Sequence, residues 1–456
     1  MNRTFLLAIA CFSTCVCINL FAADAARPNV IFILADDLGY GDLGCYGQQK
    51  IKTPAIDKLA AEGTRFTQVY AGCTVCAPSR CALMTGKHTG HATIRGNMSP
   101  EPAVRADEIC LAEIFKAAGY STAMIGKWGV GLNDSTGAPN KKGFDYFLGY
   151  LTQQAAHNYY PPFIWKNAEK YPLDGNAGGK QGVYTHDLFA QEALKYIREK
   201  RDVPFFLYLP FTIPHTNNEA KPNGMQVPSD APYSDEKWPA TEKNFAAMIT
   251  RMDSDIGKIM ALLKELNLDE RTLVIFTSDN GPHKEGGHDS EFFKSRGALR
   301  GIKRDLYEGG IRIPAIARWP GKVPAGVVSD QVWAFWDVLP TMAEFTGQKI
   351  PGGIDGVSVL PALLGKSAVE HPPLYWEFHE RGFSQAVRMG DWKAVKPGLQ
   401  KPWELYDLAK DVGEEHDVAE QHKEIIAKVE EFVKSARVDS ELFPIVPKPK
   451  AATGNK

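Results

Sequence analysis

The chain has 456 residues, with 52 Lys and Arg against 54 Asp and Glu, and therefore a formal net charge of −2. With 44% apolar and 23% charged residues, the composition is that of a globular protein, which excludes a disordered, collagen-like or coiled-coil chain. The chain has no excess of basic residues to neutralise a phosphate backbone, so we expect no nucleic acid partner. Its length accommodates one large α/β domain and a smaller one.

The first 25 residues have the features of a secretory signal peptide. Arg3 supplies a positive charge, residues 5–22 are mostly apolar, and Ala23-Asp24-Ala25 is a small-residue cleavage pattern. An uncleaved membrane anchor is the alternative, although three polar residues interrupt the apolar run. We expect a secreted or periplasmic protein with no stable membrane insertion after cleavage, since no other apolar run has membrane-spanning length.

Short apolar runs recur along the chain, and each leads into charged or polar residues. They are rich in β-branched and aromatic side chains, which is typical of strands buried on both faces. The runs cover residues 29–35, 120–126, 204–211 and 272–278. Helical patterns are found at residues 53–61, 111–118, 184–201 and 241–266. Strands that alternate with helices predict a largely parallel sheet covered by helices on both faces.

The residues that follow these runs are candidates for one site, because ligands bind outside the carboxyl ends of parallel strands. The predicted edge collects Asp36, Asp37, Lys127, His215, Asp279 and Asn280. Each residue alone also has an ordinary structural interpretation, such as a helix cap or a solvated charge. Three carboxylates and an amide in one place need a cation, because otherwise they repel one another. Oxygen ligands favour Ca²⁺ or Mg²⁺, and outside the cytoplasm we expect one Ca²⁺.

A cysteine-rich segment, residues 72–86, predicts a short helix. Pro78 suits its first turn and Gly86 its end, which places Cys76 at the helix N-terminus, where an anion is favoured. From spacing alone, Cys76 could be a buried thiol, a disulfide partner of Cys73 or Cys81, or half of a zinc knuckle. The knuckle is disfavoured, because no second C-x-x-C or paired His completes it.

At this segment the chain resembles the sulfatase family. Cys76-Ala-Pro-Ser-Arg80 matches the family's C-x-P-S-R pattern. Four further segments match in the family's order, namely residues 27–37, 277–281, 303–314 and 403–408. The resemblance covers nearly all of the predicted mature chain. It implies that a formylglycine-generating enzyme oxidises Cys76 to formylglycine before folding is complete.

The resemblance also implies a fold: an alkaline-phosphatase-like α/β/α sandwich with a largely parallel central sheet, plus a small C-terminal α+β domain with an antiparallel sheet. The predicted divisions are a signal peptide (1–25), a catalytic domain (26–365), a C-terminal subdomain (366–445) and a disordered tail (446–456). Short strand patterns at residues 373–378, 385–388, 392–395 and 404–407, followed by a helix near 422–437, agree with the small domain.

The motifs that match the family imply a role for each of the candidate site residues. Asp36, Asp37, Asp279 and Asn280 would bind the Ca²⁺, together with the modified Cys76. Arg80 would hold the hydrated aldehyde, Lys127 and Lys303 would bind sulfate oxygens, and His215 would protonate the leaving oxygen. One hydroxyl of the hydrate would attack sulfur and release the alcohol. The second hydroxyl would then expel sulfate and restore the aldehyde.

One position departs from the family pattern. The family commonly has Gly-Lys-Trp-His where this chain has Gly126-Lys127-Trp128-Gly129. Our hypothesis is that His157, in an aromatic loop after the strand, fills the space of that histidine and assists the chemistry. The alternative is a surface or packing histidine. Nine further residues are candidates for the substrate pocket, although a loop or packing role is favoured for each of them: His88, His91, Arg95, Asn97, His283, His288, Tyr159, Tyr160 and Trp165.

The expected function is hydrolysis of sulfate esters, on a sulfated saccharide or an aryl sulfate. Two rivals stay open: a phosphoric or phosphonic ester hydrolase on the same fold, and a non-catalytic sulfate-binding relative, which the glycine at 129 motivates. Cys45, Cys73, Cys81 and Cys110 would allow one or two disulfides whose pairing stays open. The ester, exo or endo action and the oligomeric state are also open.

Overall fold

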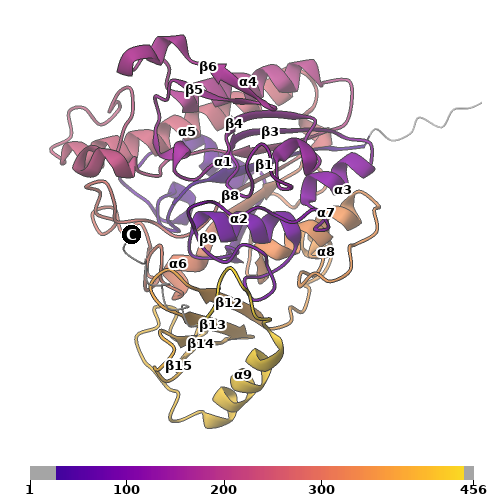
Figure 1. Cartoon of the computed structure of the whole chain (residues 1–456), viewed down its shortest axis with the longest axis vertical. Coiled ribbons are helices and arrows are strands. Elements are labelled where there is room, and N and C mark those ends of the chain that lie inside the picture. The colour runs from indigo at the N-terminus through magenta and orange to yellow at the C-terminus, as the bar shows by residue number, and fades with distance from the viewer. Residues whose placement is uncertain (1–26, 446–456) are drawn as a thin grey trace, which may run out of the picture.

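The computed structural model describes residues 27–445, and Figure 1 shows its two sheets and their helices. The predicted signal segment and the predicted tail lie outside the described residues. The large sheet contains the strands β1 (Asn29–Ala35), β2 (Thr64–Tyr70), β3 (Ser121–Lys127), β4 (Tyr146–Tyr150), β5 (Phe163–Lys166), β6 (Glu169–Pro172), β7 (Phe205–Pro210), β8 (Thr272–Ser278), β9 (Arg312–Arg318), β10 (Val327–Ser329) and β11 (Trp333–Ala334).

The large sheet is mostly parallel, as expected. Its order is β10-β2-β9-β8-β1-β7-β3-β4-β5-β6, with β11 beside β2. The strands from β8 to β4 run parallel, while β9 is antiparallel to both β8 and β2, and β5 and β6 add an antiparallel edge. All four predicted apolar runs are strands of the central part. Every residue of β1, β7 and β8 is buried, which explains their unbroken apolar sequences.

Helices cover both faces of this sheet, so the predicted α/β/α sandwich is confirmed. One face packs against α1 (Pro54–Ala61), α4 (Thr185–Glu199) and α5 (Ala240–Glu265). The other packs against α2 (Cys76–Thr85), α3 (Leu111–Ala117), α7 (Val338–Phe345) and α8 (Leu360–Leu363). The short α6 (Glu308–Ile311) precedes β9. Within residues 27–445 no helix is long and apolar enough to cross a membrane.

A second, smaller sheet lies below these layers in Figure 1. It is antiparallel and consists of β12 (Leu374–Phe378), β13 (Ser384–Met389), β14 (Trp392–Lys396) and β15 (Glu404–Asp407), followed by α9 (Lys423–Ser435). These elements match the expected strands and helix. The boundary at residue 365 stays a prediction.

Buried polar contacts join the small sheet to the large one. The Lys393 ammonium lies 2.8 Å from a Glu308 carboxylate oxygen and 3.2 Å from one of Glu414, and all three side chains are fully buried. The indole nitrogen of Trp376 donates to the carbonyl of Ala71 at 2.9 Å. The segment just before α2 is therefore fastened to the small sheet.

Candidate active site

The carboxyl edge of the large sheet brings together the residues that the sequence placed there. Asp36 and Asp37 follow β1 directly, Lys127 is the last residue of β3, and Asp279 follows β8. His215 lies in the loop after β7, and Asn280 follows Asp279. All of these side chains are buried.

Cys76 is the first residue of α2, and Gly86 ends the helix in the left-handed conformation, as predicted. Its Sγ lies 3.5 Å from Asp36 Oδ1, and only 2% of the residue is exposed. Burial raises the pKa of the Cys76 thiol well above its ordinary value. An unmodified Cys76 is therefore a neutral thiol and a poor nucleophile.

Arg80 lies one helical turn after Cys76 and connects α2 to two strands. Its Nε and Nη2 donate to Asp279 Oδ2 at 3.1 and 2.8 Å, and its Nη1 donates to the Lys127 carbonyl at 2.6 Å. The planar guanidinium suits this two-point grip on a carboxylate. Arg80 thereby fixes the start of α2 against the ends of β3 and β8.

Two lysines face two carboxylates beside Cys76. Lys127 Nζ lies 2.6 Å from Asp36 Oδ2, and Lys303 Nζ lies 2.7 Å from Asp37 Oδ2. Burial opposes ionisation of both aspartates, but the neighbouring cations outweigh it and hold their pKa values below the usual range. Lys127 and Lys303 are therefore charged hydrogen-bond donors that lie near Cys76.

The third carboxylate, Asp279, is less well compensated. Burial and repulsion by Asp36 raise its pKa to about 7, although Arg80 is bound to it. Asn280 Oδ1 is buried without a hydrogen-bond partner, and Asp37 has a left-handed backbone with φ of 64°. Oxygen atoms of Asp36 and Asp37 also lie within 4.8 Å of Cys76 Sγ and a His215 ring nitrogen. This oxygen-rich cluster fits a hard cation.

His215 lies between two other histidines and next to Lys303. Its ring stacks on His157, with centroids 4.9 Å apart and planes at 14°, and the His283 ring lies 6.1 Å away on centroids. Nδ1 is 2.6 Å from the Thr216 carbonyl, and Nε2 is 3.1 Å from Lys303 Nζ. Burial and Lys303 lower the pKa of His215 well below its usual value, so the imidazole is neutral and Nε2 accepts from the lysine.

A cleft of about 740 Å³ opens above Cys76, His215 and Lys303. We call it the catalytic cleft. It is also lined by Asn97, Met98, Ser99, Pro100, Glu101, Leu132, Thr152, Gln153, Gln154, His157, Asn218, Glu219, Glu285, Arg304 and Glu380. Most of these come from loops, and Glu380 comes from the segment after β12. Few of them could be predicted from the sequence, because polar loop residues carry no periodic signal.

The space beside Gly129 is filled by Gln153, so the prediction that His157 occupies it is wrong. Gly129 has φ of 79°, and a Cβ built there would lie 1.7 Å from Gln153 Nε2. That Nε2 donates to the Gly129 carbonyl at 3.3 Å. His157 instead lies on the cleft wall, where its Nδ1 is 3.2 Å from both Glu219 carboxylate oxygens. Its part in the chemistry stays a prediction.

Of the further pocket candidates, only Asn97 lines the cleft, and its Oδ1 accepts from the Ala77 amide at 3.1 Å. The others have structural contacts elsewhere: His88 and His91 with Asp355, Arg95 with Glu377, His283 behind His215, His288 stacked on Phe245, Tyr159 with the Thr212 carbonyl, Tyr160 against Tyr184, and Trp165 against Phe163. The ordinary structural interpretation therefore holds for these.

The five cysteines in the described part of the chain are Cys45, Cys73, Cys76, Cys81 and Cys110, and all are free. The disulfides that an oxidising compartment would allow are not formed in this part of the chain. Burial raises the pKa of the Cys73, Cys81 and Cys110 thiols, so these are inert core residues.

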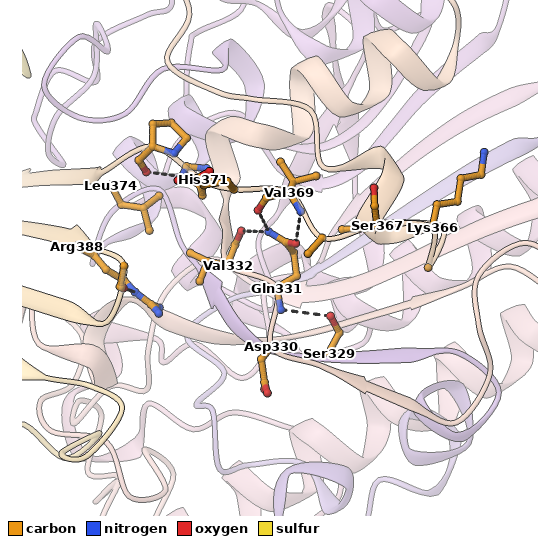
Figure 2. A pocket seen from close by; sticks show the side chains of 16 residues that line it. Ser329, Asp330, Gln331, Val332, Lys366, Ser367, Val369, His371, Leu374 and Arg388 are labelled. Atoms are coloured by element: carbon orange, nitrogen blue, oxygen red, sulfur yellow. Dashed lines mark hydrogen bonds between the residues drawn. The ribbon is translucent and has the colours of Figure 1, made fainter.

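A second cavity, of about 700 Å³, lies between the Ser329–Val332 segment and the connection to the small sheet (Figure 2). The Gln331 side chain crosses its wall, donating to the Val332 and Val369 carbonyls and accepting from the Val369 amide. His371 Nε2 is 2.8 Å from Asp337 Oδ2. The Gln331 and His371 side chains therefore already have partners within the protein.

The layered fold, with carboxylates and cations meeting at the carboxyl edge of its sheet, defines an alkaline-phosphatase-like hydrolase. The sulfatase family model matches residues 28–348. The model for the C-terminal part of N-sulphoglucosamine sulphohydrolase matches residues 302–439. The chain belongs to the sulfatase family and is a sulfuric ester hydrolase.

Similar proteins extend this assignment over most of the chain. Rat N-acetylgalactosamine-6-sulfatase is 32% identical over 85% of this chain and 75% of its own length. Human arylsulfatase A is 32% identical over 87% of this chain and 84% of its own length. The structure of Ps i-CgsB in complex with k-i-k-neocarrahexaose has a TM-score of 0.79 and 30% identity, covering 90% of this chain and 93% of that one.

Proposed function

We propose that this sulfatase hydrolyses sulfate esters of saccharides with a formylglycine formed from Cys76 and with one bound Ca²⁺. The observation that carries the proposal is the position of Cys76. It lies at the start of α2, beside Asp36, with the ammonium groups of Lys127 and Lys303 bound to the adjacent carboxylates. A buried neutral thiol in this position has little reactivity of its own, whereas an aldehyde hydrate would carry two hydroxyl groups.

Asp36, Asp37, Asp279 and Asn280 would hold the Ca²⁺, and the modified residue 76 would complete the set. The raised pKa of Asp279 and the unpartnered Asn280 Oδ1 support this assignment, because a cation would satisfy both. Bound there, the ion would supply positive charge for a sulfate oxygen and for the charge that develops on the sulfuryl group.

The formylglycine hydrate would supply one hydroxyl to attack sulfur, with release of the alcohol, and a second whose deprotonation expels sulfate and restores the aldehyde. Arg80 would orient it from one helical turn away. Lys127 and Lys303 would turn from Asp36 and Asp37 towards sulfate oxygens as compact point charges.

His215 and Lys303 would together provide the proton for the leaving oxygen. The His215 Nε2 accepts a hydrogen bond from the Lys303 ammonium, so the pair holds an exchangeable proton although the imidazole itself is neutral. In this proposal Lys303 passes its proton to His215 Nε2, and His215 delivers it to the leaving oxygen.

The substrate class is proposed from the relatives and from the cleft. One relative is named an N-acetylgalactosamine-6-sulfatase, and the structure of Ps i-CgsB holds a neocarrahexaose. The catalytic cleft presents amide, hydroxyl and carboxylate side chains suited to sugar hydroxyls. We further propose maturation by a formylglycine-generating enzyme and a secreted or periplasmic location, based on the Cys76 motif and the N-terminal sequence.

Three measurements test this function. Mass analysis of the tryptic peptide that contains Cys76 should show an aldehyde in protein made together with a formylglycine-generating enzyme. That protein should hydrolyse p-nitrophenyl sulfate, and the Cys76→Ala variant should not. Chelation should remove the activity and Ca²⁺ should restore it. Full activity in Cys76→Ala, or faster turnover of p-nitrophenyl phosphate than of the sulfate, would refute the proposal.

A further inference from the structure

The mouth of the catalytic cleft carries more negative than positive charge. Four glutamates line it: Glu101, Glu219, Glu285 and Glu380. They come from four separate loops, after α2, β7, β8 and β12 respectively. The only cationic side chains in this lining are Lys303, which lies deep and faces Asp37, and Arg304.

Arg304 is already paired with two of these glutamates. Its guanidinium contacts a Glu285 carboxylate oxygen and lies 3.6 Å from Glu380 Oε2. Glu285 also lies 3.7 Å from Lys303 Nζ. One guanidinium shared between two carboxylates leaves no free cation at the mouth for a second anion of the substrate.

Arg304 pairs with neither of the other two glutamates, Glu101 and Glu219. Glu219 is 52% exposed at its side chain and faces His157, whose pKa is lowered by burial and by Lys127, so that the imidazole is neutral near pH 7. Glu101 accepts the backbone amide of Gln153 and, among residues 27–445, forms no ion pair. The pKa of Glu101 is raised by burial from an ordinary value of 4.5.

Beside the apolar Met98, Pro100 and Leu132, the rest of the wall has uncharged polar side chains. They are Asn97, Ser99, Thr152, Gln153, Gln154 and Asn218. Gln153 is 7% exposed, and its Oε1 has no partner in the described structure. Carboxylates and amides accept hydrogen bonds from hydroxyl groups, while carboxylates repel a second sulfate or a uronate at close range.

We infer that the catalytic cleft selects a neutral, hydroxyl-bearing sugar whose scissile sulfate is its only nearby anion, and that it rejects rings with an adjacent sulfate or carboxylate. This inference rests on the proposed function and narrows its substrate. Removing one carboxylate from within about 6 Å of such an anion should change kcat/KM for that substrate about three- to tenfold, which equals about 0.7–1.4 kcal/mol at dielectric constants of about 80 to 40.

The test compares kcat/KM for monosulfated and disulfated forms of one sugar. The monosulfated probe is the sugar that the wild type hydrolyses fastest among galactose 6-sulfate, N-acetylgalactosamine 4-sulfate, N-acetylgalactosamine 6-sulfate and N-acetylglucosamine 6-sulfate. Its partner carries one further sulfate on the same ring. The wild type should favour the monosulfated sugar by at least about tenfold, and added salt should narrow that ratio because it screens the repulsion.

Glu101→Gln and Glu219→Gln should each lower the ratio of kcat/KM for the monosulfated sugar to kcat/KM for the disulfated sugar about three- to tenfold. A loss of activity that affects both substrates equally leaves this ratio unchanged. Glu431→Gln, an exposed carboxylate on α9, is the matched control and should leave the ratio unchanged. Equal kcat/KM for the two sugars in the wild type, or an unchanged ratio in both cleft variants, would overturn the inference. Failure to hydrolyse any sulfate ester, p-nitrophenyl sulfate included, would instead refute the proposed function.

Discussion

A single methyl group at position 129 should disturb the catalytic cleft. In Gly129→Ala the new Cβ would lie 1.7 Å from Gln153 Nε2, far inside any real contact, and the backbone φ of 79° is unfavourable for alanine. The left-handed backbone costs about 1–2 kcal/mol. Displacement of the packed Gln153 side chain costs about 1–3 kcal/mol more. The expected loss in the free energy of unfolding is about 2–5 kcal/mol.

A double-mutant cycle separates these two costs. In a Gln153→Ala background the obstacle is gone, so Gly129→Ala should cost only the backbone part, about 1–2 kcal/mol. Urea unfolding of the four proteins gives the coupling, and kcat/KM for p-nitrophenyl sulfate reports the cleft. If Gly129→Ala costs the same with and without the Gln153 side chain, the steric reasoning is refuted. Gly129 would then be required for its backbone conformation alone.

Three other changes have expected outcomes. His157→Ala should slow turnover of p-nitrophenyl sulfate about 10²-fold if the imidazole gives acid–base help, and wild-type turnover would end that hypothesis. Lys393→Met takes from the buried Glu414 its cation and leaves the buried Glu308 with Arg312 alone, so it should lower the free energy of unfolding by about 3–5 kcal/mol, and an unchanged urea midpoint would contradict it. Burial opposes ionisation of Glu377, but His379 and Arg95 outweigh it and lower its pKa to about 2 from an ordinary 4.5. The stability that Glu377 contributes should therefore be complete above pH 4.5 and disappear as the pH falls towards 2, and Glu377→Gln should flatten the measured unfolding curve over that window.

The sequence was most informative where a strand delivers a side chain directly. Asp36, Lys127 and Asp279 stand at or just past the ends of apolar strands, so the rule for parallel sheets placed them at one edge before any contact was known. The antiparallel β9 was not predicted from its hydrophobic pattern, because Arg312 and Arg318 at its ends are buried through ion pairs that a pattern cannot foresee.

Loop residues were placed less well for a physical reason. Gln153 and His157 are four positions apart in one polar loop, and either was compatible with the space left by Gly129. Which one turns towards it depends on long-range contacts, such as that of His157 with Glu219, 62 residues away. The glutamates of the cleft mouth come from four loops, so their shared location is a property of the fold alone.

The burial of Cys76 sets the time at which it can be modified. In the folded chain only 2% of Cys76 is exposed, every residue of α2 is buried, and Arg80 fastens the helix to β3 and β8. An enzyme cannot reach a side chain buried in this way, so the proposed oxidation has to precede folding. Folded protein with an unmodified thiol should stay unmodified when mixed with a formylglycine-generating enzyme and oxygen, whereas the urea-unfolded chain or a peptide of residues 70–86 should gain the aldehyde by mass analysis. Equal modification of folded and unfolded chains would show that α2 opens readily, and would contradict the rigid placement of Cys76 on which the chemistry depends.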